Sequence, residues 1–414
     1  MVPSSADGAA RTAYLREIGA LLWPPPASVV VAGSGADPRT PTTEVLLVPD
    51  ARRPRLLVPA GKPRAAAAAV RRYSQPRSRM AWLRTQALSL SIRTGVGDKV
   101  LRDRVRVYDG SDADTIETYL CEVLGRDVRL SLHIGPPRAN RKPVLQLVSD
   151  KGVTMGFAKI GVNDLTRRLV RAEGSALRTL ASADLPSMTI PSVLHDGRWR
   201  ELEVLVLSAL PVRRRRGSSS AARVTSAAIE LARVAGTTTE TLAASDYWRN
   251  LAARLADAGD GRAADSLRTI IGELTARAGS TTLTFGAWHG DWSPWNMSVL
   301  RDTVLVWDWE RFTTGVPVGY DLVHYALQDL VVVKRREPAG AVGDLLAVAP
   351  ELLKPIGLAD DVATVTAMLY LIELAGRYVV DGQAEAGARL GAPEEWLLPQ
   401  LAAKIATMTG GTPS

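Results

Sequence analysis

A run of three short strands followed by a helix, between residues 128 and 180, most restricts how this chain can fold. "VRLSLHI" alternates apolar and polar residues, and "VLQLVS" and "VTMGFAKIG" follow it, separated by the turn "DKG". From residue 163 onward, apolar residues recur every three or four positions, as on one face of a helix. A second hairpin, "PSVLHDGRWRELEVLVLSALP", comes next. These patterns predict a small antiparallel sheet that carries one helix.

The rest of the C-terminal half has the periodicity of helices, from about 218 to 280 and again after 315. A small sheet followed by a mainly helical region predicts an α+β protein in two lobes. The chain has 414 residues, which is too long for one ordinary core. We predict an extra N-terminal domain at 1–112, a sheet lobe at 113–212 and a helical lobe at 213–414.

The extra N-terminal α/β domain has a pattern of its own. Shifted by 100 positions, residues 28–73 align with 128–173 as strand, glycine loop, strand, turn, strand and helix. One interpretation is a degenerate internal copy of the sheet lobe. The alternative is that hairpin-plus-helix units resemble one another by chance. A copy would lack charged residues at two positions, since Lys159 aligns with Pro59 and Glu173 with Tyr73.

Charge and composition exclude several classes of protein. The formal net charge is +8, but acidic residues outnumber basic ones after residue 300, which is not the pattern of a nucleic-acid binder. No apolar run approaches the ~20 residues of a membrane span, and the N-terminus does not read as a secretory signal. The single Cys121 cannot form an internal disulfide and reads as a small buried apolar residue. We therefore expect a cytoplasmic protein.

Polar and aromatic residues are concentrated in "WHGDWSPWNMSVLRDTVLVWDWERF", residues 288–312. This stretch holds five of the ten tryptophans. "TVLVWDWE" reads as a strand, which would place Asp308 and Glu310 on the same side. Together with Asp291 and Asn296 they make a set of oxygen ligands whose mutual repulsion is best relieved by a cation. Such a set suits Mg²⁺ and is poor for Zn²⁺, and Mg²⁺ with few protein ligands usually accompanies phosphates.

The segments "HGDWSPWN" and "WDWE" resemble the motifs H-G-D-x-x-x-x-N and D-x-E/D of the protein-kinase-like phosphotransferases. The resemblance is closest to the aminoglycoside phosphotransferase and choline kinase branch. It implies a bilobal fold, with a small antiparallel-sheet N-lobe and a mainly helical C-lobe. It also implies an ATP- and Mg²⁺-dependent kinase that transfers the γ-phosphate to a hydroxyl of a small molecule or sugar.

The resemblance implies a role for each residue of the motif. Asp291 would accept or orient the proton of the attacking hydroxyl. His289 would support the same catalytic loop without reacting. The metal ligands would be Asn296 and Asp308, with Glu310 bound to a second ion or to a ligand of the first. Downstream, "GVPVGYDLVHY" would place Asp321 as a buried brace that caps a helix.

Upstream, the resemblance requires a strand lysine that holds the ATP phosphates and a helix glutamate that holds the lysine. "GFAKI" supplies Lys159, and "RAEGSAL" supplies Glu173. Backbone groups around Ser208 and Leu210 would bind adenine.

The loop expected to cover the phosphates, "IGPPRANRKP", is not the G-x-G-x-x-G of protein kinases. Arg138 and Arg141 are candidates to bind phosphate in place of backbone amides. Alternatively, they are exposed turn charges.

The tryptophans leave two interpretations open. Trp307 and Trp309 are expected in the core, whereas Trp292 and Trp295 either bind the acceptor or pack internally. The acceptor itself is not determined and is a sugar, an amino alcohol or an aminoglycoside-like compound. The alternative function is a catalytically silent nucleotide-binding scaffold that acts through its N-terminal domain. Against it, the lysine, the base and the metal aspartate are all present.

Overall fold

The structure is a computed structural model that divides into two compact units. Unit 1 contains Met1–Gly174 and Ser192–Ala209, and unit 2 contains Ser175–Pro191 and Leu210–Ser414. The structure describes residues 5–32, 40–73, 79–97, 101–108, 114–135, 141–212, 221–256, 259, 261–380 and 392–408. The predicted boundary between residues 112 and 113 falls inside unit 1. Each unit is described by itself.

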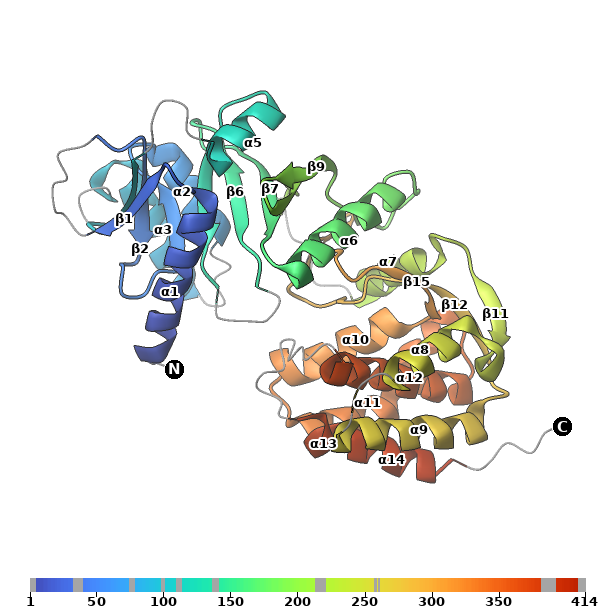
Figure 1. The fold of residues 1–414 in the computed structure, drawn as a ribbon. Helices are drawn as coiled ribbons and strands as arrows, with labels where there is room; N and C mark the ends of the chain where they lie inside the picture. Colours follow the sequence, from blue (N-terminus) through green and yellow to red (C-terminus); the bar gives the residue numbers. More distant parts are fainter. Residues whose placement is uncertain are drawn as a thin grey trace. The chain divides into compact units, whose positions relative to one another are not determined.

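Unit 1 is built on one nine-stranded sheet in the order β1-β4-β2-β3-β5-β6-β7-β10-β9 (Figure 1). Every pair of neighbouring strands in it is antiparallel. The strands are β1 (Ser28–Ala32), β2 (Thr43–Val48), β3 (Leu56–Pro59), β4 (Arg104–Tyr108), β5 (Arg129–His133), β6 (Val144–Val148), β7 (Thr154–Gly161), β9 (Val193–Trp199) and β10 (Leu202–Ser208). The helices are α1 (Ser5–Leu22), α2 (Pro63–Tyr73), α3 (Arg79–Arg93), α5 (Ile116–Leu124) and α6 (Asp164–Leu180), whose last residues belong to unit 2.

The N-terminal strands and the predicted sheet lobe form a single sheet, because β3 pairs with β5. Leu57 lies opposite Leu132 in this pairing, and the Ser131 hydroxyl donates to the Leu57 carbonyl at 2.7 Å. The order of elements in residues 28–73 follows that of residues 128–173, but the strand order does not. β1 pairs with β4, whereas β5 pairs directly with β6.

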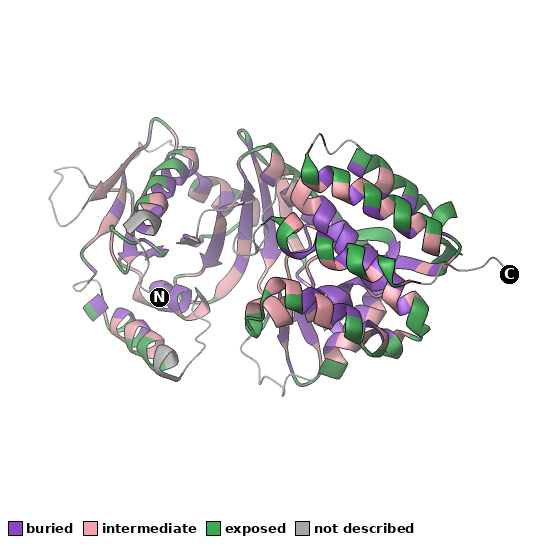
Figure 2. Ribbon diagram, turned by 90° about the horizontal axis from the view of Figure 1, so that it is seen from below, coloured by how far each residue is buried: buried purple, intermediate pink, exposed green. Residues whose placement is uncertain are grey.

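The two faces of the sheet are covered by different helices, as the strand period of two requires. On β2, Leu47 belongs to one core together with Ile18 of α1, while Leu46 belongs to another with Ala66 of α2. The core that contains α1 continues along the same face of the sheet toward its other edge, where it includes Val204 of β10. Buried residues follow the strands of unit 1 and the inner faces of the helices (Figure 2). The N-terminal helix is therefore part of the core beneath the strands of the predicted sheet lobe.

Unit 2 is mainly helical, with two three-stranded sheets in the orders β11-β12-β15 and β13-β14-β8. Its strands are β8 (Met188–Thr189), β11 (Thr238–Thr241), β12 (Thr282–Trp288), β13 (Met297–Val299), β14 (Val304–Val306) and β15 (Thr313–Pro317). Its α-helices are α7 (Ala221–Arg233), α8 (Asp246–Ala256), α9 (Arg262–Ala278), α10 (Tyr320–Gln328), α11 (Pro338–Leu353), α12 (Asp360–Val380), α13 (Pro393–Trp396) and α14 (Leu398–Ala406). Short 3-10 helices η1 (Leu242–Ala244) and η3 (Lys354–Ile356) and a π-helix η2 (Asp329–Val333) complete it. The predicted α+β class, with an antiparallel sheet region and a helical C-terminal region, is confirmed.

Helix α12 is the longest helix in the described part of the chain. Its stretch Asp360–Val379 is long and apolar enough to cross a membrane by length and composition. However, 78% of its most apolar window is buried inside the protein, as in the central helix of a helical core.

If α1 shares a core with the predicted sheet lobe, then shortening a side chain of α1 should loosen strands β5–β7. Ile18 is 1% exposed, and Ile18→Ala should lower the free energy of unfolding by about 2–5 kcal/mol. Urea unfolding measures this loss of stability. Hydrogen exchange of the β5–β7 amides should also become faster. Arg16→Ala, at an exposed position of the same helix, should change stability by less than about 0.5 kcal/mol. Unchanged protection of β5–β7 in Ile18→Ala would contradict the shared core.

Candidate active site

In unit 1, a buried ion pair joins β7 to α6. The ammonium group of Lys159 lies 2.6 Å from each carboxylate oxygen of Glu173. Lys159 is 9% exposed and Glu173 is fully buried. Removing one partner from such a pair leaves an uncompensated buried charge and is strongly destabilising. The structure thus brings together the two residues that the sequence predicted as partners.

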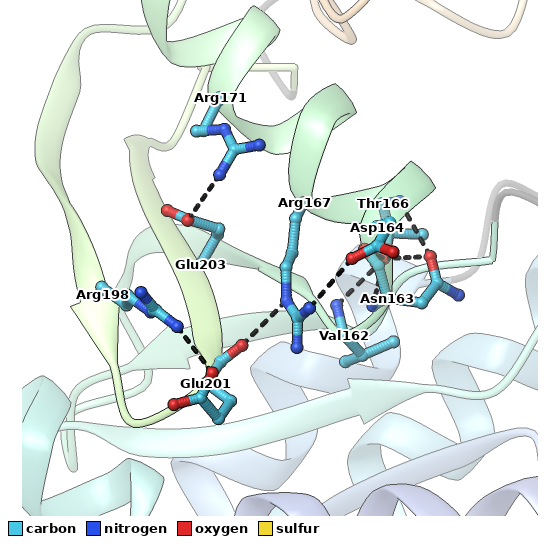
Figure 3. A network of polar contacts seen from close by, with 9 residues as sticks. All are labelled: Val162, Asn163, Asp164, Thr166, Arg167, Arg171, Arg198, Glu201 and Glu203. Carbon is cyan, nitrogen blue, oxygen red and sulfur yellow. Dashed lines mark hydrogen bonds and ion pairs between the residues drawn. The ribbon is translucent and has the colours of Figure 1, made fainter.

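The start of α6 is fixed by a cap in which side chains bond the backbone (Figure 3). The hydroxyl of Thr166 accepts from the amides of Val162 and Asn163, at 2.9 and 3.0 Å. The Asn163 side chain in turn accepts from the Thr166 amide at 2.9 Å. These bonds satisfy backbone donors that the first turn of a helix leaves without partners. A Cβ at Gly161 would lie 2.7 Å from the Cα of Arg167, so the tight turn into the helix needs glycine there.

Two arginines then attach α6 to the β9–β10 hairpin (Figure 3). Arg167 donates to the carbonyl of Glu201 at 2.9 Å, and Arg171 pairs with Glu203 of β10 at 2.9 Å. Exposed contacts of this kind contribute little stability individually, but both lie on one face of a helix that is already capped. Because Glu173 follows Arg171 by two residues, the same contacts set the position from which its carboxylate reaches Lys159.

In unit 2, strand β12 leads into the loop that contains His289, which is fully buried. One ring nitrogen, Nδ1, accepts from the amide of Asp291 at 3.2 Å. The other, Nε2, lies 3.2 Å from the carbonyl of Trp307, to which it donates in the neutral tautomer that both contacts require. Burial lowers the pKa of His289 to about 4, so the ring is neutral near pH 7. Both ring nitrogens contact backbone groups, the Asp291 amide and the Trp307 carbonyl, which fits the predicted supporting role.

Asp321 holds the same loop from helix α10. Its carboxylate accepts from the amides of His289 at 2.8 Å and Gly290 at 3.2 Å. Gly290 has a φ of 83°, and a Cβ there would lie 2.5 Å from the carbonyl oxygen of Arg311. On the other side, Arg377 of α12 donates to the Gly290 carbonyl at 2.9 Å. Asp321 is therefore a buried brace as predicted, but the predicted cap is wrong, since the residue at the N-cap of α10 is Gly319.

The carboxylate of Asp291 is held by two side chains, one on each oxygen. The amide nitrogen of Asn296 donates to Oδ2 at 2.8 Å, and Nε2 of His324 lies 3.1 Å from Oδ1. The Asp291 side chain keeps 29% of its surface exposed, whereas that of His324 keeps 3%. Burial would raise the pKa of Asp291, but the hydrogen bond from His324 opposes this effect, and the pKa lies below its ordinary value. Asp291 is therefore an ionised carboxylate with solvent access.

His324 and its partner Tyr370 were not among the predicted site residues. The Tyr370 hydroxyl lies 2.8 Å from Nδ1 of His324, and Tyr370 is 1% exposed. One signal was present in the sequence, because His324 follows Asp321 by three residues and so shares its helix face. Nothing local points to Tyr370, which lies 46 residues further along the chain.

The predicted metal ligands lie in the same unit. A carboxylate oxygen of Asp308 and one of Glu310 are within 4.8 Å of each other. The strand that was expected to place them on one side ends at Val306, and Asp308 instead has a left-handed backbone with a φ of 74°. Because the Asn296 nitrogen is bonded to Asp291, its amide oxygen is the atom left for a cation. This all-oxygen set fits Mg²⁺.

The tryptophans of the motif mostly pack inside unit 2. Trp292 is fully buried, with its ring 5.8 Å from that of His289, so its predicted role in acceptor binding is contradicted by its lack of exposed surface. Trp309 is also fully buried, 4.6 Å from the His289 ring, and Trp307 packs against the Leu210–Leu305 cluster. Trp295 is half-buried, and its role stays a prediction.

The residues predicted to contact the nucleotide base and the phosphates are less directly placed. Ser208 ends β10 in unit 1, where its hydroxyl accepts from the Ser192 amide at 2.8 Å, and Leu210 belongs to unit 2. Arg138 lies outside the described residues. The guanidinium carbon of Arg141 lies 3.2 Å from the centroid of the Tyr14 ring in α1. A contact between Arg141 and phosphate would require the guanidinium group to leave the Tyr14 ring. The predicted roles of Ser208, Leu210, Arg138 and Arg141 in nucleotide binding all stay predictions.

Burial of Asp321 leads to a testable pH dependence. Burial raises its pKa from 3.8 to about 7, against the opposing effect of the two backbone donors and Arg377. Between these values the folded chain binds the proton more tightly than the unfolded chain, so this group's contribution to stability falls as pH rises. Asp321→Asn does not titrate. Its stability relative to wild type should therefore increase from pH 4 to pH 7, by up to about 4 kcal/mol.

Urea unfolding of both proteins across this pH range measures the effect, and groups common to both cancel in the difference. Asp302→Asn, at an exposed position, should track wild type at every pH. A constant difference between Asp321→Asn and wild type would show that Asp321 does not titrate as described.

Comparison with known proteins finds a family model that matches part of the chain. Residues 157–353 match the model of the phosphotransferase enzyme family, APH. No curated protein shows significant similarity to the chain. Similar solved structures include a thermostable mutant of aminoglycoside phosphotransferase APH(4)-Ia with ADP and hygromycin B, which is 16% identical (TM-score 0.45, covering 72% of this chain and 99% of that one). Another is APH(2")-IIa with streptomycin and ATP, at 14% identity (TM-score 0.44, covering 73% and 98%).

A third is the amicoumacin kinase hAmiN with AMP-PNP and Ca²⁺, at 14% identity (TM-score 0.39, covering 66% and 87%). The similarity to the phosphotransferase enzyme family rests on the family model and not on these solved structures, which are distant. The match contains Lys159, Glu173, Asp291, Asn296 and Asp308 in the order that the sequence resemblance requires. Residues 157–353 of the chain are therefore similar to the phosphotransferase enzyme family.

Proposed function

We propose that this protein transfers the γ-phosphate of ATP to a hydroxyl group of a small molecule. The observation that carries the proposal is the environment of Asp291. Its carboxylate is ionised, partly exposed and held on both oxygens by buried groups, Asn296 and His324. A base for a hydroxyl proton needs this combination of an accessible lone pair and a fixed orientation. The family match supports the same class of reaction.

In the proposed reaction the acceptor oxygen attacks the γ-phosphorus and its proton passes to a carboxylate oxygen of Asp291. A new O–P bond forms, the bond from the γ-phosphorus to the β–γ bridging oxygen breaks, and ADP leaves with that electron pair. Asp291 orients the hydroxyl before transfer and takes up its proton. The remaining protein contribution is to position the reactants and neutralise charge.

Other residues would hold the nucleotide. Lys159 would pair with its phosphates, and Glu173 would keep the ammonium group in place from a fully buried position. Asn296 and Asp308, with Glu310, would hold Mg²⁺, which neutralises phosphate charge when bound. Backbone groups near Ser208 and Leu210 are our proposal for adenine.

For the acceptor we propose a hydroxylated amine, of which aminoglycosides and amino alcohols are examples. Acidic residues outnumber basic ones after residue 300, which favours a cationic compound over a neutral sugar. Two of the similar structures named above hold hygromycin B and streptomycin. Trp295, a half-buried tryptophan of the motif, is the aromatic residue that we propose for contact with it.

An acceptor screen tests the reaction. With Mg-ATP, wild type should release ADP in the presence of at least one member of a library of aminoglycosides, amino alcohols and sugars. Asp291→Asn should lower kcat about 10²- to 10⁴-fold, because the base is lost, while ATP affinity changes little. Asp302→Asn replaces an exposed aspartate of the same motif and should behave as wild type. Binding of ATP without acceptor-dependent ADP release across the library would favour a silent scaffold instead.

The nucleotide contact of Lys159 can be tested without an acceptor. Mg-ATP should raise the melting temperature of wild type, since a ligand that binds only the folded state stabilises it. Lys159→Ala should lose most of this increment. The variant is also less stable without ligand, because Glu173 loses its partner, so each protein is compared with its own ligand-free form. Lys151→Ala, at an exposed position beside β7, should keep the full increment. An equal increment in Lys159→Ala would remove the lysine from the nucleotide site.

A further inference from the structure

We propose that His324 and Tyr370 act as a positioning pair for Asp291, in which the tyrosine hydroxyl fixes the histidine tautomer and the histidine fixes the carboxylate. The inference rests on the proposed function, because it concerns the group assigned there as the base. Neither residue was among the predicted site residues, although His324 lies in the segment "GVPVGYDLVHY" that was quoted for Asp321.

The three groups form a continuous chain of hydrogen bonds inside unit 2. Tyr370 of α12 reaches Nδ1 of His324 at 2.8 Å, and Nε2 of His324 of α10 reaches Oδ1 of Asp291 at 3.1 Å. His324 is 2% exposed and Tyr370 is 1% exposed, so water does not compete for these bonds. Only the last member of the chain, Asp291, has an exposed surface, at 29% of its side chain.

For a neutral ring, one arrangement of protons satisfies both contacts of His324. A tyrosine hydroxyl can donate to Nδ1 only when that nitrogen carries no proton, which places the proton of a neutral ring on Nε2. Nε2 then donates to the carboxylate. In the other tautomer, the lone pair of Nε2 would face the negatively charged oxygen of Asp291, an unfavourable contact in a buried setting. Burial raises the pKa of Tyr370 well above its ordinary value, so its hydroxyl keeps the proton that it donates.

The pair matters because it completes the restraint on the carboxylate. Asn296 holds Oδ2 at 2.8 Å and His324 holds Oδ1, so the plane of the group cannot rotate. The lone pairs that remain on the two oxygens then have fixed directions toward an incoming hydroxyl. Misplacing a reacting group by about 1 Å can cost about 10²-fold in rate. His324 does not touch the acceptor in this scheme, and its effect passes entirely through Asp291.

The alternative is that His324 is only a core residue, since its ring also packs edge-on against Tyr370 with centroids 5.8 Å apart. A packing role predicts a loss of stability without a change specific to turnover. The positioning role predicts that kcat falls while KM for ATP is unchanged. It also predicts that the two residues act as one unit, so that their effects on kcat are not additive.

The test uses four single variants and one double variant of the protein, assayed with an acceptor from the screen above. His324→Leu should lower kcat about 10²-fold with KM for ATP within about twofold of wild type. His324→Gln, whose amide nitrogen can replace Nε2 as a donor, should recover most of that loss. Tyr370→Phe should lower kcat by a smaller factor, about threefold to tenfold, and should have no further effect in the His324→Gln background. Tyr325→Phe, at a half-buried position of the same helix, should match wild type.

Nitrogen-15 spectra of the histidine rings give a readout that needs no turnover. The chain has 4 histidines, and the His324→Leu spectrum identifies the signals that belong to His324. Wild type should show the proton on Nε2, and Tyr370→Phe should show a mixture of tautomers. A proton on Nδ1 in wild type, or unchanged kcat in His324→Leu, would overturn the positioning pair. Absence of Mg-ATP binding in wild type would instead overturn the proposed function, whatever the tautomer.

Discussion

The carboxylate of Asp321, buried beneath the His289–Asp291 loop, is the interaction on which the site depends. A buried carboxylate is costly unless it is hydrogen-bonded, and here the amides of His289 and Gly290 meet that need. These two bonds hold Gly290 in a left-handed conformation that a Cβ would not permit. Arg377 donates to the carbonyl of the same glycine, and Glu373 in turn binds both Arg377 and Arg254. The direction of the Asp291 side chain follows from this framework.

Tryptophans and buried polar groups occur together in this motif for a physical reason. Hydrogen bonds are stronger where water is excluded, but every polar group there must then find a partner. The fully buried rings of Trp292 and Trp309 pack edge-on around His289, whose two nitrogens both contact backbone groups, the Asp291 amide and the Trp307 carbonyl. The rings exclude water, and the backbone supplies the partners. This arrangement rigidifies the polar residues and leaves Asp291 partly exposed.

The features that the sequence predicted are those fixed by local periodicity. Lys159 and Glu173 could be paired because the strand and helix that hold them are regular and only 14 residues separate them. For Trp292 the sequence left acceptor binding and internal packing both open, because an irregular loop has no period from which to read the direction of a side chain. Asp308 and Glu310 do lie near each other, but through a left-handed residue beyond the strand and not through the strand itself.

Contacts between segments that are far apart in the chain could not be predicted, for a different reason. Tyr370 of one helix contacts His324 of another, and β3 pairs with β5 in the middle of the sheet. Neither contact leaves a repeat in the sequence. The pattern of residues 1–112 showed strands and a helix, but it could not show that they extend the neighbouring sheet. Packing of helices and pairing of strand edges depend on the whole fold, so a single sequence constrains them weakly.

The place of α1 in the core has a consequence for biosynthesis. The helix is synthesised well before β10, yet its apolar side is buried in a core that includes Val204 and Val206 of β10. Domains generally fold as units during translation, and contacts between segments far apart in the chain form slowly. Leu15, Ile18 and Leu22 must therefore wait in the nascent chain, exposed or covered by a chaperone, until β10 has emerged.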